Sequence, residues 1–177
     1  MRYLCLGATP ETDSEAFAQI GRFLSAALDL PLQQIHLPAL DFAFDAGRGQ
    51  YASIAILEMV NRLCPQDALR LVGVTERDLF IPVLTFVFGH AQLGGRAAVV
   101  SLARLRQEFY GLAPNQEIFL DRARKEALHE TGHTFGLVHC ADRSCAMALS
   151  TRVQQIDQKR AAFCPACVRQ LSKGVMI

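Results

Sequence analysis

The chain has 177 residues, of which 51% are hydrophobic and 20% charged, a composition that fits one globular domain and excludes an intrinsically disordered protein. Eighteen Lys and Arg residues against seventeen Asp and Glu residues give a net charge of +1. This balance argues against a nucleic-acid-binding protein that depends on a large basic surface. We therefore expect a single domain that spans residues 1–177.

The first 75 residues alternate between strand and helix patterns. Hydrophobic periodicity predicts strands at residues 2–7, 32–37 and 68–75, amphipathic helices at 14–30 and 51–63, and a loop at 39–50. Asp13 or Ser14 is suited to cap the first helix, and Pro65 is suited to end the second.

The remaining residues contain a hairpin pattern and a long helix pattern. The predicted elements are a polar connection at 76–78, strands at 85–90 and 96–102, a helix at 118–135, a short helix at 153–159 and a tail after Cys167. Gly94 and Gly95 mark the hairpin turn, Asn115 or Gln116 starts the long helix, and Gly136 follows its end. This order predicts an α+β, α/β-like fold in which a small mixed sheet packs on long helices.

The sequence also bears on the compartment. No apolar run reaches the roughly 18 residues of a membrane-spanning helix, and the N-terminal segment turns acidic after a short apolar stretch, unlike a signal peptide. We therefore expect a cytoplasmic monomer without a membrane or nucleic-acid partner. Cys5 and Cys64 are interpreted as small buried hydrophobic residues. Thiols are expected to stay reduced in the cytoplasm, so the clustered cysteines near the C-terminus indicate metal ligation or redox chemistry.

The strongest chemical motif is His129-Glu130-Thr131-Gly132-His133. Residues four apart on an α-helix share one face, with about 6 Å between their side-chain origins. From there two imidazoles can reach one Zn²⁺ ion at about 2.0–2.1 Å each. Glu130 points about 100° away from His129, which places its carboxylate beside the metal rather than on it. This pattern predicts a zinc-bound water whose proton Glu130 accepts.

A third histidine, His139, lies ten residues beyond His129. A continuous helix would place it about 15 Å along the axis, so the helix must end for His139 to reach the same ion. Gly136 is the residue that can adopt the left-handed conformation of such a turn. We therefore predict His129, His133 and His139 as the ligands of a catalytic zinc with one open coordination position.

Four cysteines follow this motif. Cys140, Cys145, Cys164 and Cys167 can close a tetrahedral Cys₄ site, and we predict a structural zinc there. Two alternatives are a redox dithiol at Cys164 and Cys167, and a nucleophilic Cys140 paired with His139. Met147, eight residues after His139, is a candidate for an apolar floor beneath the histidines.

The string His-Glu-x-x-His-x-x-Gly-x-x-His followed by methionine is the metzincin signature. Together with the four cysteines, it makes the sequence resemble the archaemetzincin (archaelysin) family of zinc metallopeptidases. Segments 78–80, 86–89, 101–105, 109–111 and 125–126 are also similar to that family. The resemblance covers residues 70–170, and residues 1–65 are assigned on architecture alone. Sixteen residues separate Met147 from Cys164, one fewer than in the family, a difference that a loop can absorb.

The resemblance implies a metzincin-like fold with a sheet above the zinc helix, one catalytic zinc and one structural zinc. It also implies hydrolysis of peptide bonds, with short peptides as substrates. From the residues themselves, we expect Glu130 to take the proton of the attacking water and return it to the leaving amine. The predicted strand at 96–102 is a candidate edge for binding an extended peptide, or else an interior strand without that role.

Two other functions remain open from the sequence. A metal-stabilised interaction module is the first, because Arg152, Lys159, Arg160, Arg169 and Lys173 outnumber Asp157 near the cysteines and could bind nucleic acid. More often such charges form a solvated face. A zinc hydrolase of non-peptide amides is the second, since it would use the same residues. Glu130 argues against the interaction module, because a purely structural His₃ site has no use for a carboxylate there.

Overall fold

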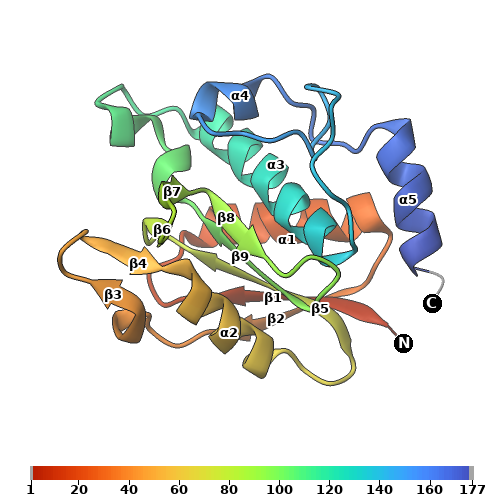
Figure 1. Ribbon diagram of the computed structural model, residues 1–177, viewed down its shortest axis with the longest axis horizontal. Helices are drawn as coiled ribbons and strands as arrows, with labels where there is room; N and C mark the ends of the chain where they lie inside the picture. Colours follow the sequence, from red (N-terminus) through yellow and green to blue (C-terminus); the bar gives the residue numbers. More distant parts are fainter. Residues whose placement is uncertain (1, 176–177) are drawn as a thin grey trace.

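The computed structural model describes residues 2–175 (Figure 1). Its strands are β1 (Tyr3–Ala8), β2 (Leu32–His36), β3 (Phe44–Asp45), β4 (Gln50–Ala52), β5 (Ala68–Thr75), β6 (Leu79–Ile81), β7 (Leu84–Val87), β8 (Gly89–Ala91) and β9 (Ala97–Ser101). Its α-helices are α1 (Ser14–Leu28), α2 (Ser53–Leu63), α3 (Gln116–Thr134), α4 (Val153–Asp157) and α5 (Pro165–Val175), with 3₁₀ turns at Asp41–Ala43, Ala103–Leu105 and Gln107–Tyr110.

Five strands form the larger sheet, in the order β2-β1-β5-β9-β8. The first four are mutually parallel, and β8 pairs antiparallel with β9 at one edge. Helices α1 and α3 cover one face of this sheet and α2 covers the other (Figure 1). Because both faces are covered, the central strands are almost continuously apolar; all five residues of β9 are buried.

The core divides according to the alternation of side chains along each strand. In β1, Leu4 and Leu6 belong to the cluster under α1 and α3, whereas Tyr3 and Cys5 belong to the cluster under α2. Cys64 joins the second cluster, so both cysteines outside the C-terminal group are buried, as predicted. The predicted mixed sheet with long helices packed on it is therefore confirmed.

A second sheet, in the order β3-β4-β6-β7, was not predicted. The predicted loop at 39–50 contains a 3₁₀ turn and β3, and Tyr51 belongs to β4 rather than to the helix, which begins at Ser53. The predicted strand at 85–90 is two strands, because residues 84–87 pair with β6 and residues 89–91 pair with β9. Strands of two to four residues are too short to show a periodicity in the sequence.

The C-terminal part differs from the prediction in one element. The expected tail after Cys167 is helix α5, which begins at Pro165. Proline suits the first helical position because its missing N–H would have no partner there. In the described part of the chain, no helix has the length and apolarity that crossing a membrane requires.

Candidate active site

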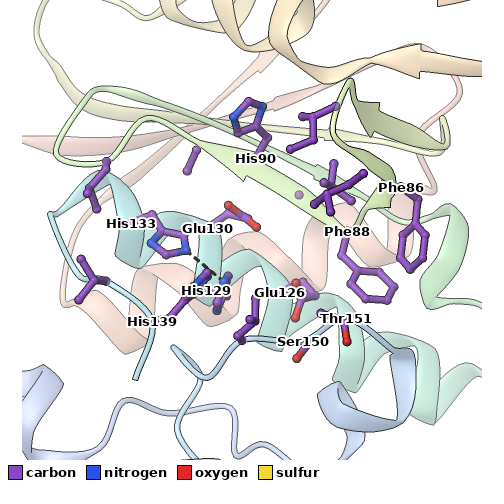
Figure 2. Close-up of a pocket in the computed structure, with 18 of the residues that line it drawn as sticks. Phe86, Phe88, His90, Glu126, His129, Glu130, His133, His139, Ser150 and Thr151 are labelled. Atoms are coloured by element: carbon purple, nitrogen blue, oxygen red, sulfur yellow. Dashed lines mark hydrogen bonds between the residues drawn. The ribbon is translucent and has the colours of Figure 1, made fainter. Parts of the chain in front are cut away.

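Helix α3 carries the first two histidines of the site. Asn115 starts the helix by accepting a hydrogen bond from the backbone N–H of Ile118. After the helix, Gly136 has φ of +87°, and this left-handed turn reverses the chain. His139 thereby returns to the zinc-binding face, and the candidate ligand atoms of all three histidines lie within 4.8 Å of one another (Figure 2).

The ring orientations show which nitrogen atoms are available. Nδ1 of His129 lies 2.8 Å from the carbonyl oxygen of Ala146, and Nδ1 of His133 lies 2.7 Å from that of Leu137. A carbonyl can only accept, so each Nδ1 carries the proton and each Nε2 of the neutral ring has a free lone pair. Burial lowers the pKa of His129 well below 6.5 and also lowers the pKa of His133, which favours the neutral rings.

The two free lone pairs then face each other. Nε2 of His129 and Nε2 of His133 are 3.1 Å apart, and neither can donate a hydrogen bond to the other in these tautomers. Zinc–nitrogen bonds of about 2.0–2.1 Å in a tetrahedral site separate the ligand nitrogens by about 3.3–3.4 Å. The donor set therefore fits a zinc ion, with His139 as the candidate for the third nitrogen ligand.

Glu130 lies in a cavity of about 500 Å³. The cavity is bounded by α3, by residues 84–91 of β7 and β8, and by residues 149–151. Its lining is mainly apolar and includes Leu149, with Phe86 and Phe88 together on one side (Figure 2). Burial raises the pKa of Glu130 well above 4.5, and the neighbouring Glu126 raises it further.

Gly89 makes room for Glu130, a role that the sequence did not reveal. A Cβ atom on Gly89 would lie 2.5 Å from Cγ and 2.6 Å from Oε1 of Glu130. These separations are far shorter than the ~3.5–4.0 Å of an ordinary carbon contact. Strand β8 can therefore approach α3 this closely only with glycine at position 89.

We expect Gly89→Ala to displace the Glu130 carboxylate and to lower the hydrolysis rate about 100-fold, the cost of roughly 1 Å of misplacement. Zinc content is expected to stay unchanged, because the three atoms nearest to the new methyl group all belong to Glu130 rather than to a histidine. Gly7→Ala is the matched control: its Cβ would lie 2.8 Å from Leu37 Cγ, in the core away from the cavity. Equal rate losses in both variants would contradict a specific role for Gly89.

The edge of the larger sheet beside the cavity is β8, not β9. The strand predicted at 96–102 lies between β5 and β8 and is fully buried, so it is the interior strand of the two alternatives. Gly89, His90 and Ala91 line the cavity instead. His90 anchors β8 to α2 through a 3.0 Å hydrogen bond between its Nδ1 and Ser53 Oγ.

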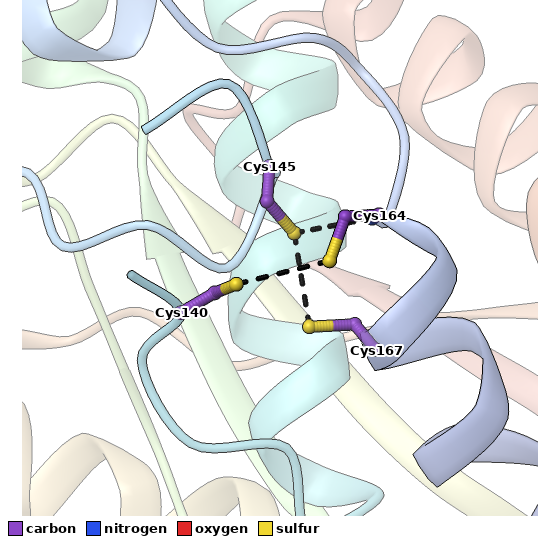
Figure 3. A group of neighbouring side chains, drawn as sticks. All are labelled: Cys140, Cys145, Cys164 and Cys167. Atoms are coloured by element: carbon purple, nitrogen blue, oxygen red, sulfur yellow. Dashed lines mark hydrogen bonds between the residues drawn. The ribbon is translucent and has the colours of Figure 1, made fainter. Parts of the chain in front are cut away.

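The four cysteines converge on one point (Figure 3). Sγ of Cys140 lies 3.8 Å from Sγ of Cys164, and Sγ of Cys145 lies 3.8 Å from Sγ of Cys167. A tetrahedral site with Zn–S bonds of about 2.3 Å separates its sulfurs by about 3.8 Å. Backbone N–H groups of Met147 and Cys164 donate to the Cys145 sulfur, and the N–H of Cys167 lowers the pKa of Cys164 to about 7. The set fits a structural zinc.

Met147 is completely buried between the cysteines and the zinc helix. A Cβ atom on Gly132 would lie 2.5 Å from Sδ of Met147, so the methionine packs directly against the backbone of α3. Gly132 stands between the two zinc-helix histidines in the sequence, and its lack of a side chain permits this contact. Met147 therefore packs against the helix that carries His129 and His133, and its role as an apolar floor beneath the histidines stays a prediction.

Buried charges beneath the cavity were not predicted. Lys159, interpreted from the sequence as part of a basic face, has a fully buried side chain whose Nζ lies 3.4 Å from Oε1 of Glu126. Arg122, also buried, makes a two-point ion pair with Asp157 of α4 at 2.7 and 2.8 Å. Both ion pairs join α3 to residues in or just after α4. The interpretation of Lys159 as a surface charge is wrong because a distant carboxylate in α3 pairs with it.

We expect Lys159→Met to destabilise the protein by about 3–5 kcal/mol, because it leaves the buried Glu126 carboxylate without its cation. Burial raises the pKa of Glu126, and Lys159 opposes that shift. Replacing both residues, as in Glu126→Leu with Lys159→Met, is expected to recover most of the loss. Denaturant unfolding measures both variants, and a double variant no more stable than Lys159→Met would contradict the pairing.

Comparison with known proteins gives consistent matches. A family model described as Peptidase family M54 matches residues 18–173. Archaemetzincin from Methanocaldococcus jannaschii is 42% identical over 145 residues, covering 80% of this chain and 79% of that protein. The crystal structure of archaemetzincin from Methanopyrus kandleri matches with a TM-score of 0.88 at 36% identity, covering 100% of this chain and 96% of that one. A zinc-dependent peptidase from Methanocorpusculum labreanum matches with a TM-score of 0.85 at 30% identity, covering 95% and 99%.

Proposed function

The chain belongs to peptidase family M54, the family of the archaemetzincins, and from this membership we propose that it hydrolyses short peptides with His129, His133 and His139 as zinc ligands and Glu130 as general base. It is a zinc metallopeptidase with sites that fit one catalytic and one structural zinc. The observation that carries the proposal is the convergence of two unprotonated Nε2 atoms beside a buried carboxylate in an apolar cavity.

The chemistry divides between the metal and the chain. A zinc ion held by His129, His133 and His139 would lower the pKa of a bound water and polarise the scissile carbonyl. Glu130 accepts the proton of the attacking water and donates it to the leaving amine. Burial raises the pKa of Glu130 from its ordinary value towards the operating pH, where a group that first accepts and then donates a proton works best. The carbonyls of Ala146 and Leu137 keep two imidazoles oriented throughout.

The shape of the cavity supports short, extended peptides as substrates. Among the described residues 2–175, β8 pairs with β9 along one side and with no strand along the other, and its residues line the cavity. Its remaining backbone N–H and C=O groups can add an extended peptide to the sheet. A volume of about 500 Å³ accommodates a few side chains, and the apolar lining favours hydrophobic ones.

A peptide-library digestion read by mass spectrometry tests this function. We expect cleavage of peptides shorter than about a dozen residues by zinc-loaded protein and none after chelation. Folded proteins are expected to resist, because a cavity of this size cannot admit them. Zinc-loaded protein that leaves the whole library intact would contradict the proposal.

A further inference from the structure

Residues around the cysteine cluster hold the candidate zinc-binding histidines in place. We define the cysteine knuckle as residues 140–148 together with Cys164 and Cys167. Ala146, which lies between Cys145 and Met147, supplies the carbonyl that fixes the buried His129 ring at 2.8 Å. The backbone N–H of Ala146 in turn donates to the carbonyl of Ala162, at 3.0 Å, two residues before Cys164. The orientation of His129 therefore depends on the shape of the knuckle.

His139 is connected to the knuckle through the backbone itself. It directly precedes Cys140, whose N–H donates to the Met147 carbonyl at 2.9 Å, and Cys140 also forms an isolated bridge with Ala148. Because one peptide bond joins the two residues, their Cα atoms are fixed about 3.8 Å apart. Any displacement of Cys140 on losing a metal ion therefore shifts His139, whose side chain is exposed rather than packed in the core.

His133, the remaining histidine, is connected to the knuckle through packing. The carbonyl that orients His133 belongs to Leu137, and Leu137 is buried in the same apolar cluster as Met147 and the cysteines. Met147 packs against Gly132, the residue just before His133. Each of the three histidines is thus held by a hydrogen bond, a peptide bond or a packed side chain that originates in the knuckle or in its apolar cluster.

From these contacts we propose that metal in the Cys₄ site sets the zinc affinity of the His₃ site, so that the two metal sites bind cooperatively. The inference rests on the proposed ligand roles of His129, His133 and His139. Without an ion, the four sulfur atoms, which lie within 4.8 Å of one another, have no metal bonds to hold the knuckle closed. The His₃ site must then order its own ligands when zinc binds, which lowers its affinity.

The expected size follows from the contacts that would be loosened. Loss of the partners that orient metal-ligating histidines typically costs 10–100-fold in metal affinity. Cooperativity between two sites is reciprocal, so zinc in the His₃ site is expected to tighten the Cys₄ site by the same factor. The effect adds to the structural role of the Cys₄ metal, which alone would stabilise the fold without changing the histidine site.

Calorimetric zinc titration of the full, reduced chain tests the proposal. One sample is wild-type protein from which all metal has been removed and to which one equivalent of Cd²⁺ has then been added. Cd²⁺ is a soft ion that prefers the four thiolates. The other is Cys164→Ser/Cys167→Ser, whose Cys₄ site cannot close. We expect zinc to bind the His₃ site 10–100-fold more weakly in the double variant, with folding of both checked by circular dichroism. Equal affinities in two folded samples would overturn the proposal.

A second pair of variants decides the matter if the cysteine variant does not fold. Met147→Ala removes the knuckle's contact with Gly132 while leaving all seven candidate ligands in place. Met59→Ala is the matched control, because Met59 is also buried but belongs to the cluster under α2. With Cd²⁺ in the Cys₄ site, we expect weaker zinc binding at the His₃ site in Met147→Ala alone. Equal His₃ affinities in the two variants would overturn the proposal.

The same titration separates this inference from the proposed function. A cadmium-loaded wild-type protein that binds no zinc, or whose zinc binding survives His133→Ala unchanged, would overturn the proposed ligands themselves. If zinc binding disappears in His133→Ala but its affinity in the wild-type histidine site is the same whether or not the Cys₄ site holds metal, only the cooperativity is overturned.

Discussion

Glu130→Gln is expected to lower the rate of peptide hydrolysis by a factor of about 10²–10⁴ while zinc remains fully bound. The substitution keeps the volume of the side chain and leaves the three histidines in place. The amide, however, cannot accept a proton from water. The cavity lining is mainly apolar and Glu130 itself is buried, so bulk water is a poor substitute for the lost base.

The control for this variant is Glu117→Gln, which makes the same chemical change in the exposed first turn of the same helix. We expect Glu117→Gln to retain the wild-type rate. Zinc content and hydrolysis rate are measured on the same preparation of each protein. A Glu130→Gln protein with full zinc and an unchanged rate would show that Glu130 is not the general base.

Loss of the Cys₄ metal is expected to lower the stability of the fold strongly. Cys167→Ser removes one of four thiolates, and binding energy at a structural zinc site is folding energy. We expect a loss of at least about 3 kcal/mol, which for a chain of this length lowers Tm by roughly 6–12 °C. The damage is expected to centre on the knuckle and α5, because Cys167 lies in that helix.

Cys64→Ser distinguishes metal loss from loss of a buried thiol. Cys64 is also buried, but it lies in the cluster under α2 together with Cys5, away from the four cysteines of the candidate zinc site. A strong chelator that empties both sites is expected to lower the Tm of wild type and of Cys64→Ser but to change Cys167→Ser little. If the chelator lowers the Tm of Cys167→Ser as much as that of wild type, the cysteines do not hold a stabilising metal.

The chemical site was largely predictable from the sequence because its geometry is local. Four-residue spacing on a helix places His129 and His133 on one face, and a glycine that can turn the chain explains how His139 returns. The short spacing within the pairs Cys140/Cys145 and Cys164/Cys167 likewise keeps the two sulfur atoms of each pair near each other. The structure brings all seven side chains into two groups with ligand atoms within 4.8 Å of one another. Family membership was also predicted from these motifs and is confirmed.

The surroundings of the site were less predictable because they depend on contacts between distant segments. In the sequence, nothing distinguishes Gly89 from other glycines in strands, because its role depends on the contact between β8 and Glu130. Lys159 pairs with Glu126 across 33 residues, and neither residue shows in the sequence that it is buried. The edge position of β8 follows from the order of strands in the sheet, which the hairpin pattern alone does not specify. Short strands such as β3 and β6 form only because each pairs with its neighbour.

Stepwise removal of zinc most directly tests the central claim that a His₃ site performs catalysis beside a separate structural Cys₄ site. Three neutral histidines with an open position hold zinc less tightly than four thiolates, so a mild chelator is expected to empty the His₃ site first. Zinc content, hydrolysis rate, circular dichroism and Tm are followed on one sample. The account predicts that activity disappears with the first equivalent of zinc removed, that the fold and Tm remain nearly unchanged, and that one equivalent of zinc restores the rate. Activity and fold lost together at every chelator concentration would contradict it.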